Sequence, residues 1–401
     1  MSISIAKKLA AWCIGLALLV ACGVSSTAGP IPNPNPIWRS VDLPGQYSGF
    51  RSATFDRSRN CVWIISRQRG PNAGDEMSVT LTRLNVANRS IVATSVNLPA
   101  VGYDVGSIAV DSHGGIWMGW GQILAYYDPG TEAVRSWNLP PYSGLARLYS
   151  MDGRIVALTI DPDGEIWVVA SMVSAVFGFN PTTSSWDRTV NLQFVPIMGT
   201  KIGAPRTGLL TISGVPLNSG ALDPSGTPVF ALVMTGSHEV KVLPAHVRDY
   251  AMTGTDEIVY ADNAGNIAKL SLTDGVSTVV ATGAPIGRSP SAHLESDGKG
   301  DLWFSLLAYR SVGVAQLNLS TGAIKRFNFP YVIDPGGPGP PNTCPTNAIH
   351  CIPDNAVFDP GIQAIVLDQR ANVWIVTELN GSGDPNQRSP MTPIMELQTS
   401  P

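Results

Sequence analysis

The chain has few charged residues and few cysteines for its length. Of its 401 residues only 14% are charged, and 26 Lys and Arg against 30 Asp and Glu give a formal net charge of −4. Without a basic stripe, the sequence offers no site for nucleic acid. It also has no Gly-rich phosphate loop and no nucleophile–base pairing that would mark covalent catalysis. What it has in quantity is 40 Gly and 32 Pro, typical of short strands joined by tight turns.

The N-terminus carries one short apolar segment. Lys7 and Lys8 precede the run from Leu9 to Val20, which is too short for a membrane span and of the right length for the core of a secretory signal. The run closes with Leu19-Val20-Ala21-Cys22, which resembles the lipobox of bacterial lipoproteins. The resemblance implies a signal peptide over residues 1–21 and a lipid on Cys22. An ordinary signal peptide with a chance cysteine is the alternative.

Two further features bear on location. In such lipoproteins a residue like Gly23 after the cysteine, in place of an acidic one, favours the outer membrane. We therefore expect a lipid-anchored protein of the bacterial cell envelope that faces the periplasm or the exterior. Residues 22–36 alternate Pro with small polar residues, which is typical of an extended, flexible tether. Contact with the membrane is thus expected only through the lipid.

Three cysteines follow Cys22. Cys344 and Cys351 share one Pro-rich loop, and in an oxidising compartment a local disulfide is the expected pairing. A metal site with His350 as a third ligand is the alternative, disfavoured because the adjacent His350 and Cys351 are awkward tetrahedral partners. Cys61 lies in an apolar run and is predicted to be a small buried hydrophobe.

One phrase recurs along the chain: an Asp, a few residues, then an aliphatic residue and Trp at the head of an apolar run. Aligning on the Trp position also adds two degenerate copies, at Val229 and Ala268, which makes seven units. Such a repeat predicts a propeller or solenoid, because one unit alone cannot bury its apolar faces. The clear copies are DSHGGIWMGW from Asp111, DPDGEIWVVA from Asp161, DGKGDLWFSL from Asp297 and DQRANVWIVT from Asp368, with a looser DRSRNCVWIIS from Asp56.

A second phrase closes the units, an alternating strand that often ends in Leu-Pro or Phe-Pro. Six copies follow the cores, and the seventh, WRSVDLP from Trp38 to Pro44, precedes the first core. We therefore predict an all-β fold over residues 37–401: a seven-bladed β-propeller of four-stranded antiparallel blades. The N-terminal strand completes the last blade, whose other strands end at Ile394 to Leu397, and so closes the ring.

Each part of the first phrase has a predicted structural role. Asp and Gly form the turn between strands one and two, with the Asp side chain accepting backbone N–H bonds. The following strand is apolar on both faces, as in Val62-Trp63-Ile64-Ile65, because a blade packs on either side. The Trp fills the space between blades. We interpret these residues as structural rather than catalytic.

The two faces of the ring are expected to differ. Turns after the first and third strands fall on one face, which should be tight and regular. The opposite face, here called the irregular face, carries the longer segments 67–75, 194–207, 331–361 and 378–389. Long loops on a rigid scaffold are the usual place for function, and three of these belong to blades seven and one, which are neighbours in a closed ring. We predict a binding site on this face that includes Arg67, Arg310 and Glu378.

The core phrases, above all GIQAIVLDQRANVWIVTELN from Gly361 to Asn380, resemble the blades of the virginiamycin B lyase, or streptogramin lyase, family of seven-bladed propellers. They are more loosely similar to gluconolactonase-type enzymes. The lyases open a cyclic depsipeptide lactone by elimination, using Mg²⁺, a His at the head of an innermost strand and a Glu beyond the Trp strand of the same blade. The resemblance places Glu378 at the Glu position of blade seven, where Ala364 stands at the His position. It places His293 at the His position of blade six, where Leu307 replaces the Glu.

Two functions of different classes remain open. The first is a monomeric ligand- or protein-binding module that holds a peptide, glycan or protein on its irregular face and calls for no cofactor. The second is a streptogramin-lyase-like or lactone-cleaving enzyme, with His293 or Glu378 as general base and a divalent cation, Mg²⁺ or Ca²⁺, polarising an ester carbonyl. Close approach of these two side chains would favour the enzyme.

Overall fold

The computed structural model describes most of the chain from residue 37 onward. Within it, residues Ile37–Ser400 form one compact unit. The predicted signal peptide, Cys22 with its tether, Arg310, and the predicted disulfide Cys344–Cys351 lie outside the described residues. The described residues are 37–41, 47–68, 78–96, 98, 106–142, 153–192, 194–196, 200–218, 221–222, 229–243, 245–284, 286, 293–308, 311–328, 360–379 and 394–399.

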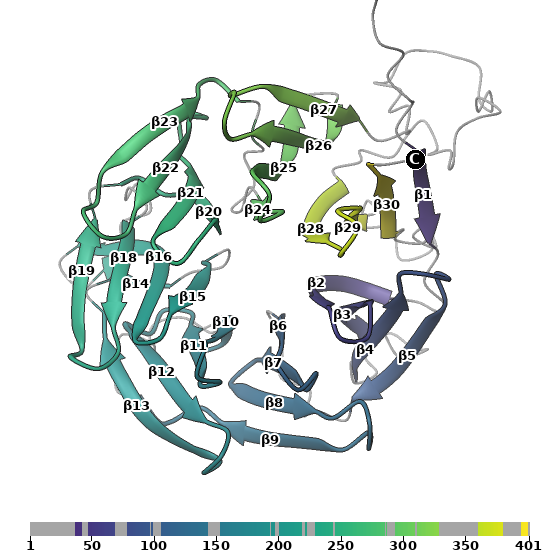
Figure 1. Cartoon of the computed structure of the whole chain (residues 1–401). Coiled ribbons are helices and arrows are strands. Elements are labelled where there is room, and N and C mark those ends of the chain that lie inside the picture. Colours follow the sequence, from purple (N-terminus) through teal and green to yellow (C-terminus); the bar gives the residue numbers. More distant parts are fainter. Residues whose placement is uncertain are drawn as a thin grey trace, which may run out of the picture. The chain divides into compact units, whose positions relative to one another are not determined.

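Seven antiparallel sheets form a ring of blades, and in blades one, two, three, five and six the strand that comes first along the chain lies innermost (Figure 1). Blade one contains β2 (Tyr47–Asp56), β3 (Cys61–Gln68), β4 (Ser78–Asn85) and β5 (Ile91–Val96). Blade two contains β6 (Gly106–Val110), β7 (Ile116–Trp120), β8 (Ile123–Tyr127) and β9 (Val134–Asn138). Blade three contains β10 (Ile155–Ile160), β11 (Ile166–Ala170), β12 (Ala175–Asn180) and β13 (Ser185–Asn191).

Blade four is the irregular sheet, with its innermost edge divided between two short strands that both pair with β16. It contains β14 (Phe194–Val195), β15 (Ile202–Arg206), β16 (Leu209–Asn218), β17 (Ala221–Leu222), β18 (Val229–Met234) and β19 (Glu239–Leu243). Blade five contains β20 (Asp249–Met252), β21 (Glu257–Ala261), β22 (Ile267–Ser271) and β23 (Ser277–Ala281). Blade six contains β24 (Glu295–Ser296), β25 (Asp301–Ala308), β26 (Ser311–Asn318) and β27 (Ile324–Asn328).

Blade seven joins the two ends of the propeller, as predicted. Its strands β28 (Pro360–Leu367), β29 (Val373–Leu379) and β30 (Ile394–Gln398) come from the C-terminal part, and β1 (Ile37–Val41) adds the outermost strand. β1 pairs antiparallel with β30, with Trp38 opposite Leu397. The sequence prediction of a seven-bladed propeller closed by its N-terminal strand is confirmed.

The predicted alignment of blades four and five was shifted by one strand. Val229 begins β18 and Ala268 lies in β22, so both belong to third strands rather than to the second strands that carry Trp elsewhere. Segment 194–207, predicted as a long loop, contains the innermost strands of blade four. The reason is that neither blade has the Trp that marks the second strand, so the nearest Asp–Gly turn was taken in its place.

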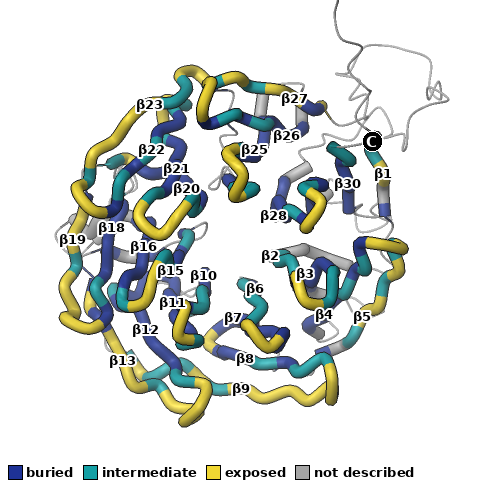
Figure 2. Tube along the Cα trace, viewed as in Figure 1, coloured by how far each residue is buried: buried dark blue, intermediate teal, exposed yellow. Residues whose placement is uncertain are grey.

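Apolar side chains fill every junction between neighbouring blades. Seven clusters of buried residues each join two adjacent blades, including the closing pair seven and one. Second strands serve two junctions at once: Trp63 and Ile65 pack toward blade two, whereas Val62 and Ile64 pack toward blade seven. Figure 2 shows the contrast with the outermost strands, of which β9 and β23 are largely exposed. Because all seven sheets and clusters lie within residues 37–398, this segment contains a complete core.

The Asp of the repeated phrase does more than form a turn. Asp161 Oδ1 accepts the backbone N–H groups of Asp163 and Glu165, and its Oδ2 accepts the indole N–H of Trp167 at 3.1 Å. Trp63, Trp117 and Trp374 donate in the same way to Asp56, Asp111 and Asp368, over 3.0 to 3.2 Å. A buried indole needs an acceptor, which explains why Asp and Trp recur together.

A buried ion pair also links the two blades where the ring closes. Glu396 of β30 has a side chain only 2% exposed, and its Oε2 accepts the Nε–H of Arg89, in the turn of blade one between β4 and β5, at 2.8 Å.

Cys61 is free and buried as predicted, and burial raises the pKa of its thiol to about 12. In the described part of the chain, no helix is long and apolar enough to cross a membrane.

Candidate functional site

Innermost strands begin on the irregular face, and four of their first residues are polar. Lys201 directly precedes β15, Asp249 is the first residue of β20, and His293 and Glu295 lie at the start of β24. These four, from blades four, five and six, are called the inner-strand cluster. His293 occupies the position that the lyase resemblance implied, two residues before the partner of a second-strand Trp. Ala364 occupies that position in blade seven and is buried.

Lys201 holds the inner-strand cluster together across three blades. Its ammonium donates to the backbone oxygen of Leu294 at 2.9 Å. The same Nζ lies 3.5 Å from Glu295 Oε1 and 3.9 Å from Asp249 Oδ1. Asp249, whose side chain is only 4% exposed, also accepts the backbone N–H groups of Tyr250 at 2.7 Å and Leu294 at 3.2 Å. The innermost strands are thus tied by charge-assisted bonds.

Burial and neighbouring charges set the protonation of the cluster. Burial opposes the charge of Lys201, but Glu295 and Asp249 outweigh it and raise the pKa of Lys201. Burial raises the pKa of Glu295, against the lowering effect of Lys201. Burial lowers the pKa of His293 to about 4, although Asp249 and a hydrogen bond with the backbone of Ile362 act in the other direction. At neutral pH His293 is therefore uncharged.

The inner-strand cluster does not fit the divalent cation that the lyase fold implies. Both of its carboxylates face the ammonium of Lys201, which stands where a cation would have to bind. Asp249 already accepts two backbone N–H groups, and a second positive charge beside Lys201 would be repelled. Among the described residues no group of three or more His, Cys, Asp or Glu side chains could hold a metal ion.

As far as the structure describes them, the predicted binding residues lie on adjacent blades. Arg67 is the second-last residue of β3, and Glu378 is the second-last residue of β29, so both end second strands on the irregular face of adjacent blades. Their side chains, that of Leu307 and all of Arg310 are outside the described residues. The distance between His293 and Glu378, on which the enzyme alternative depends, therefore involves a side chain outside the described residues.

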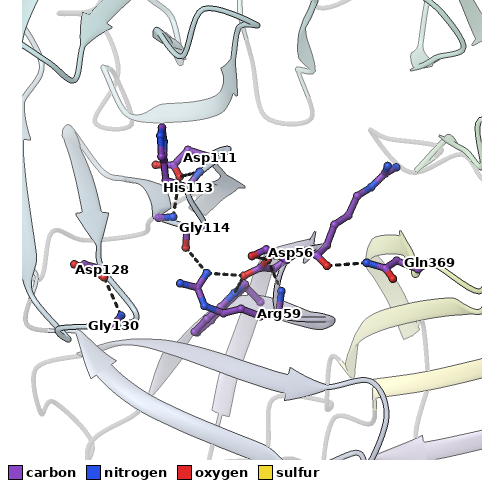
Figure 3. A network of polar contacts seen from close by, with 12 residues as sticks. Asp56, Arg59, Asp111, His113, Gly114, Asp128, Gly130 and Gln369 are labelled. Atoms are coloured by element: carbon purple, nitrogen blue, oxygen red, sulfur yellow. Dashed lines mark hydrogen bonds and ion pairs between the residues drawn. The ribbon is translucent and has the colours of Figure 1, made fainter.

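The opposite face, here called the turn face, consists of the Asp turns and the turns between third and fourth strands. Figure 3 shows how it links blades: Arg59 Nη1 donates to Asp56 Oδ2 at 3.0 Å and to the backbone oxygen of Gly114, in blade two, at 2.7 Å. Gln369 of blade seven donates to the backbone oxygen of Arg57 at 2.7 Å. Gly114 has a φ of 82°, a positive value that glycine adopts without steric cost. The structural interpretation of the turns is confirmed.

A cavity of about 600 Å³ opens on this turn face between blades two and three. The Asp turns of β6–β7 and β10–β11 flank it, and Trp117, Tyr126, Arg135 and Trp137 line the blade two side. The predicted binding site lay on the irregular face, because the turns of this face are short and regular. The cavity arises instead from the space between two blades, which no single unit of the repeat encodes.

Sequence reasoning also missed Lys201, Asp249 and Glu295. Correct placement of the first strands of blades four and five would have shown polar residues at the heads of consecutive innermost strands. The missing Trp concealed that placement. The ion pairs themselves join residues far apart in the sequence and have no local signal.

Comparisons with known proteins bear on the fold. No family model matches the sequence, and no curated protein matches it. Among solved structures, a streptogramin B lyase superposes with a TM-score of 0.56 at 12% identity, covering 91% of this chain and 98% of that one. In fold, the chain resembles the virginiamycin B lyases. A catalytically inactive virginiamycin B lyase from Staphylococcus aureus with quinupristin gives a TM-score of 0.59 at 13% identity, over 91% and 99% of the two chains.

Propellers of other functions are equally similar. The WD40 β-propeller domain of Doa1 matches with a TM-score of 0.56 at 12% identity, over 91% of this chain and 98% of that one. The likeness therefore extends to lyases and to a WD40 propeller alike, and it shows the fold alone.

Proposed function

We propose that this chain is a cell-envelope lipoprotein whose propeller binds a peptide, glycan or protein ligand on its irregular face. The observation that carries the proposal is the Lys201 ammonium between Asp249 and Glu295. The Lys201 ammonium pairs with both carboxylates at the start of the innermost strands, so these described groups form neither a metal site nor an acid–base pair. Such a cluster stabilises the scaffold and contributes to a polar binding surface.

The rest of the scaffold supports a binding role. Seven apolar clusters fix the blades relative to their neighbours, so loops that leave the irregular face stand on a rigid base. Arg67 and Glu378, at the ends of neighbouring second strands, would supply opposite charges to a ligand. The lipid on Cys22 would hold the ring at the outer membrane, and the tether at 22–36 would give it reach.

Site-specific photo-crosslinking in cells tests the binding site. Benzoylphenylalanine replaces Arg67 in one variant and Arg326 in another. Arg326 is an exposed residue on the outermost strand of blade six and serves as the matched control. We expect a discrete crosslinked species at position 67 and none at position 326. Identical products at both positions, or none at either, would contradict the proposal. The Cys22→Ser variant should leave the membrane fraction, which checks the anchor separately.

One observation favours the alternative, a lyase-like enzyme. His293 is uncharged at neutral pH and lies at the head of an innermost strand, where the lyase resemblance implied the catalytic His. A neutral imidazole is the form that a general base requires. Incubation with a streptogramin B depsipeptide and Mg²⁺, followed by mass spectrometry, decides the point. The binding proposal expects intact depsipeptide; a linear product that disappears in the His293→Ala variant would establish the enzyme.

A further inference from the structure

The cavity between blades two and three is a second candidate site, on the face opposite to the proposed binding surface. Its volume of about 600 Å³ lies within the range of small-molecule sites in proteins. The flanking turns leave it open to solvent. Elsewhere on this face neighbouring turns contact each other directly, as Arg59 does with Gly114 and Gln369 with Arg57.

One wall of this cavity is a fixed aromatic platform. The rings of Trp117 and Trp137 stack with centroids 5.8 Å apart and planes inclined by 22°. Tyr126 lies 4.9 Å from Trp117, and Phe179 supports Trp137 from behind at 4.7 Å. Trp117 is further held by its indole N–H, which donates to Asp111 at 3.0 Å. A rigid platform of this kind loses little conformational entropy when a ligand binds.

Hydrogen-bonding groups surround the platform on both sides. Arg135 lies exposed on β9, with its guanidinium 5.8 Å from the centre of the Tyr126 ring. Asp163, exposed in the blade three turn, accepts a bond from Thr207 of blade four through Oδ1 at 3.1 Å, and its Oδ2 accepts no hydrogen bond from the described residues. Burial and the charges of Asp111 and Asp128 raise the pKa of Tyr126, so its hydroxyl stays protonated. The rim thus presents donors from blade two and an acceptor from blade three.

The charges around the cavity exclude several ligand classes. Three carboxylates (Asp111, Asp161 and Asp163) and one guanidinium line the cavity. This excess of negative charge disfavours phosphates and other multiply charged anions. A cationic ligand would meet Arg135 already placed over the aromatic ring. Asp111 and Asp161 each accept three hydrogen bonds within their own turns, so their oxygens are largely engaged. A wholly apolar ligand would leave the charged rim without partners.

We propose that the cavity between blades two and three binds a short neutral saccharide. A sugar ring has an apolar C–H face that would pack on the partly buried Trp137, whose ring is supported by the almost fully buried Trp117, and hydroxyl groups that accept from Arg135 and donate to Asp163. Two or three sugar units would fill the cavity. This site is independent of the ligand on the irregular face, because the ring separates the two faces and no described residue belongs to both sites.

Saturation-transfer NMR on the chain from residue 37 tests the proposal. The probes are N,N′-diacetylchitobiose, cellobiose, maltose and lactose at millimolar concentration. Sorbitol, phosphate and tetramethylammonium are tested in the same way as ligands of other chemical classes. Binding of at least one disaccharide is expected. The Arg135→Ala and Trp137→Ala variants should weaken it by about tenfold or more. Arg326→Ala, which removes an exposed cation on the outermost strand of blade six, should leave disaccharide binding unchanged.

Four results would overturn the saccharide site. No transfer to any disaccharide would exclude it, as would equal binding of sorbitol or tetramethylammonium. Unaltered binding in both the Arg135→Ala and Trp137→Ala variants would place the sugar elsewhere; Trp137→Phe, which keeps an aromatic ring, controls for a fold damaged by truncation and should bind more tightly than Trp137→Ala. Loss of sugar binding on Glu378→Ala alone would assign the sugar to the irregular face instead.

Discussion

Removal of the Lys201 ammonium should destabilise the propeller measurably. In Lys201→Met, the buried carboxylate of Asp249 and the carbonyl oxygen of Leu294 each lose a cationic partner, at 3.9 and 2.9 Å. Hydrogen bonds to charged groups contribute about 1.5–3 kcal/mol, and the side chain of Lys201 is 34% exposed, which reduces that value through solvent screening. We expect the free energy of unfolding to fall by about 2 kcal/mol at neutral pH.

Urea unfolding of the chain from residue 37, followed by tryptophan fluorescence, measures this change. Lys269→Met is the matched control: Lys269 lies 3.7 Å from Glu257, with both side chains exposed to a similar degree as Lys201 and Glu295, but it binds no buried carboxylate. An exposed pair contributes less than about 1 kcal/mol. If both variants lost the same free energy, within about 0.5 kcal/mol, the inner-strand cluster would be an ordinary surface ion pair.

Three further predictions concern stability. Arg89→Met should cost about 2–3 kcal/mol because the carboxylate of Glu396 stays buried; equilibrium unfolding measures the loss, and a second change to Glu396→Gln should restore part of it. The unfolded chain protonates His293 at its ordinary pKa of 6.5 and the folded chain only near 4. Stability should therefore fall by about 2 kcal/mol from pH 7 to pH 5, and His293→Asn should lose that fall; an unchanged pH profile would refute it. Asp161→Ala should cost about 1–3 kcal/mol by leaving an indole N–H without its acceptor, whereas Asp163→Ala in the same turn should change thermal stability little; equal losses would contradict this.

The fold could be predicted because its repeat is local. Asp and Trp six residues apart meet through one hydrogen bond, as Asp161 and Trp167 do at 3.1 Å, so the spacing itself marks the turn and the second strand. Where the Trp is absent the mark disappears. In blade five Val259 occupies the place of the Trp. The sequence alignment of that blade was therefore made on its third strand instead of its second. The prediction of ring closure was nevertheless correct, because the outermost strands have a repeated phrase of their own.

The inner-strand cluster could be predicted only in part. His293 was identified through a resemblance that depends on its blade having Trp303. Lys201 and Asp249 were not, since their contact requires three innermost strands to converge from segments about 50 residues apart in the sequence. The cavity on the turn face had no sequence signal. It depends on the distance between two blades and on stacking of Trp117 with Trp137, neither of which a repeat alignment contains.

The most direct test of the binding account is thermal unfolding of the chain from residue 37 with and without Mg²⁺ or Ca²⁺, repeated on Glu378→Ala. A cation that binds only the folded state must raise its melting temperature. Because Lys201 already pairs with both described carboxylates, the account predicts no cation-dependent shift in either protein. A rise with Mg²⁺ or Ca²⁺ that disappears in Glu378→Ala would place a metal on the irregular face and contradict the account in favour of an enzyme.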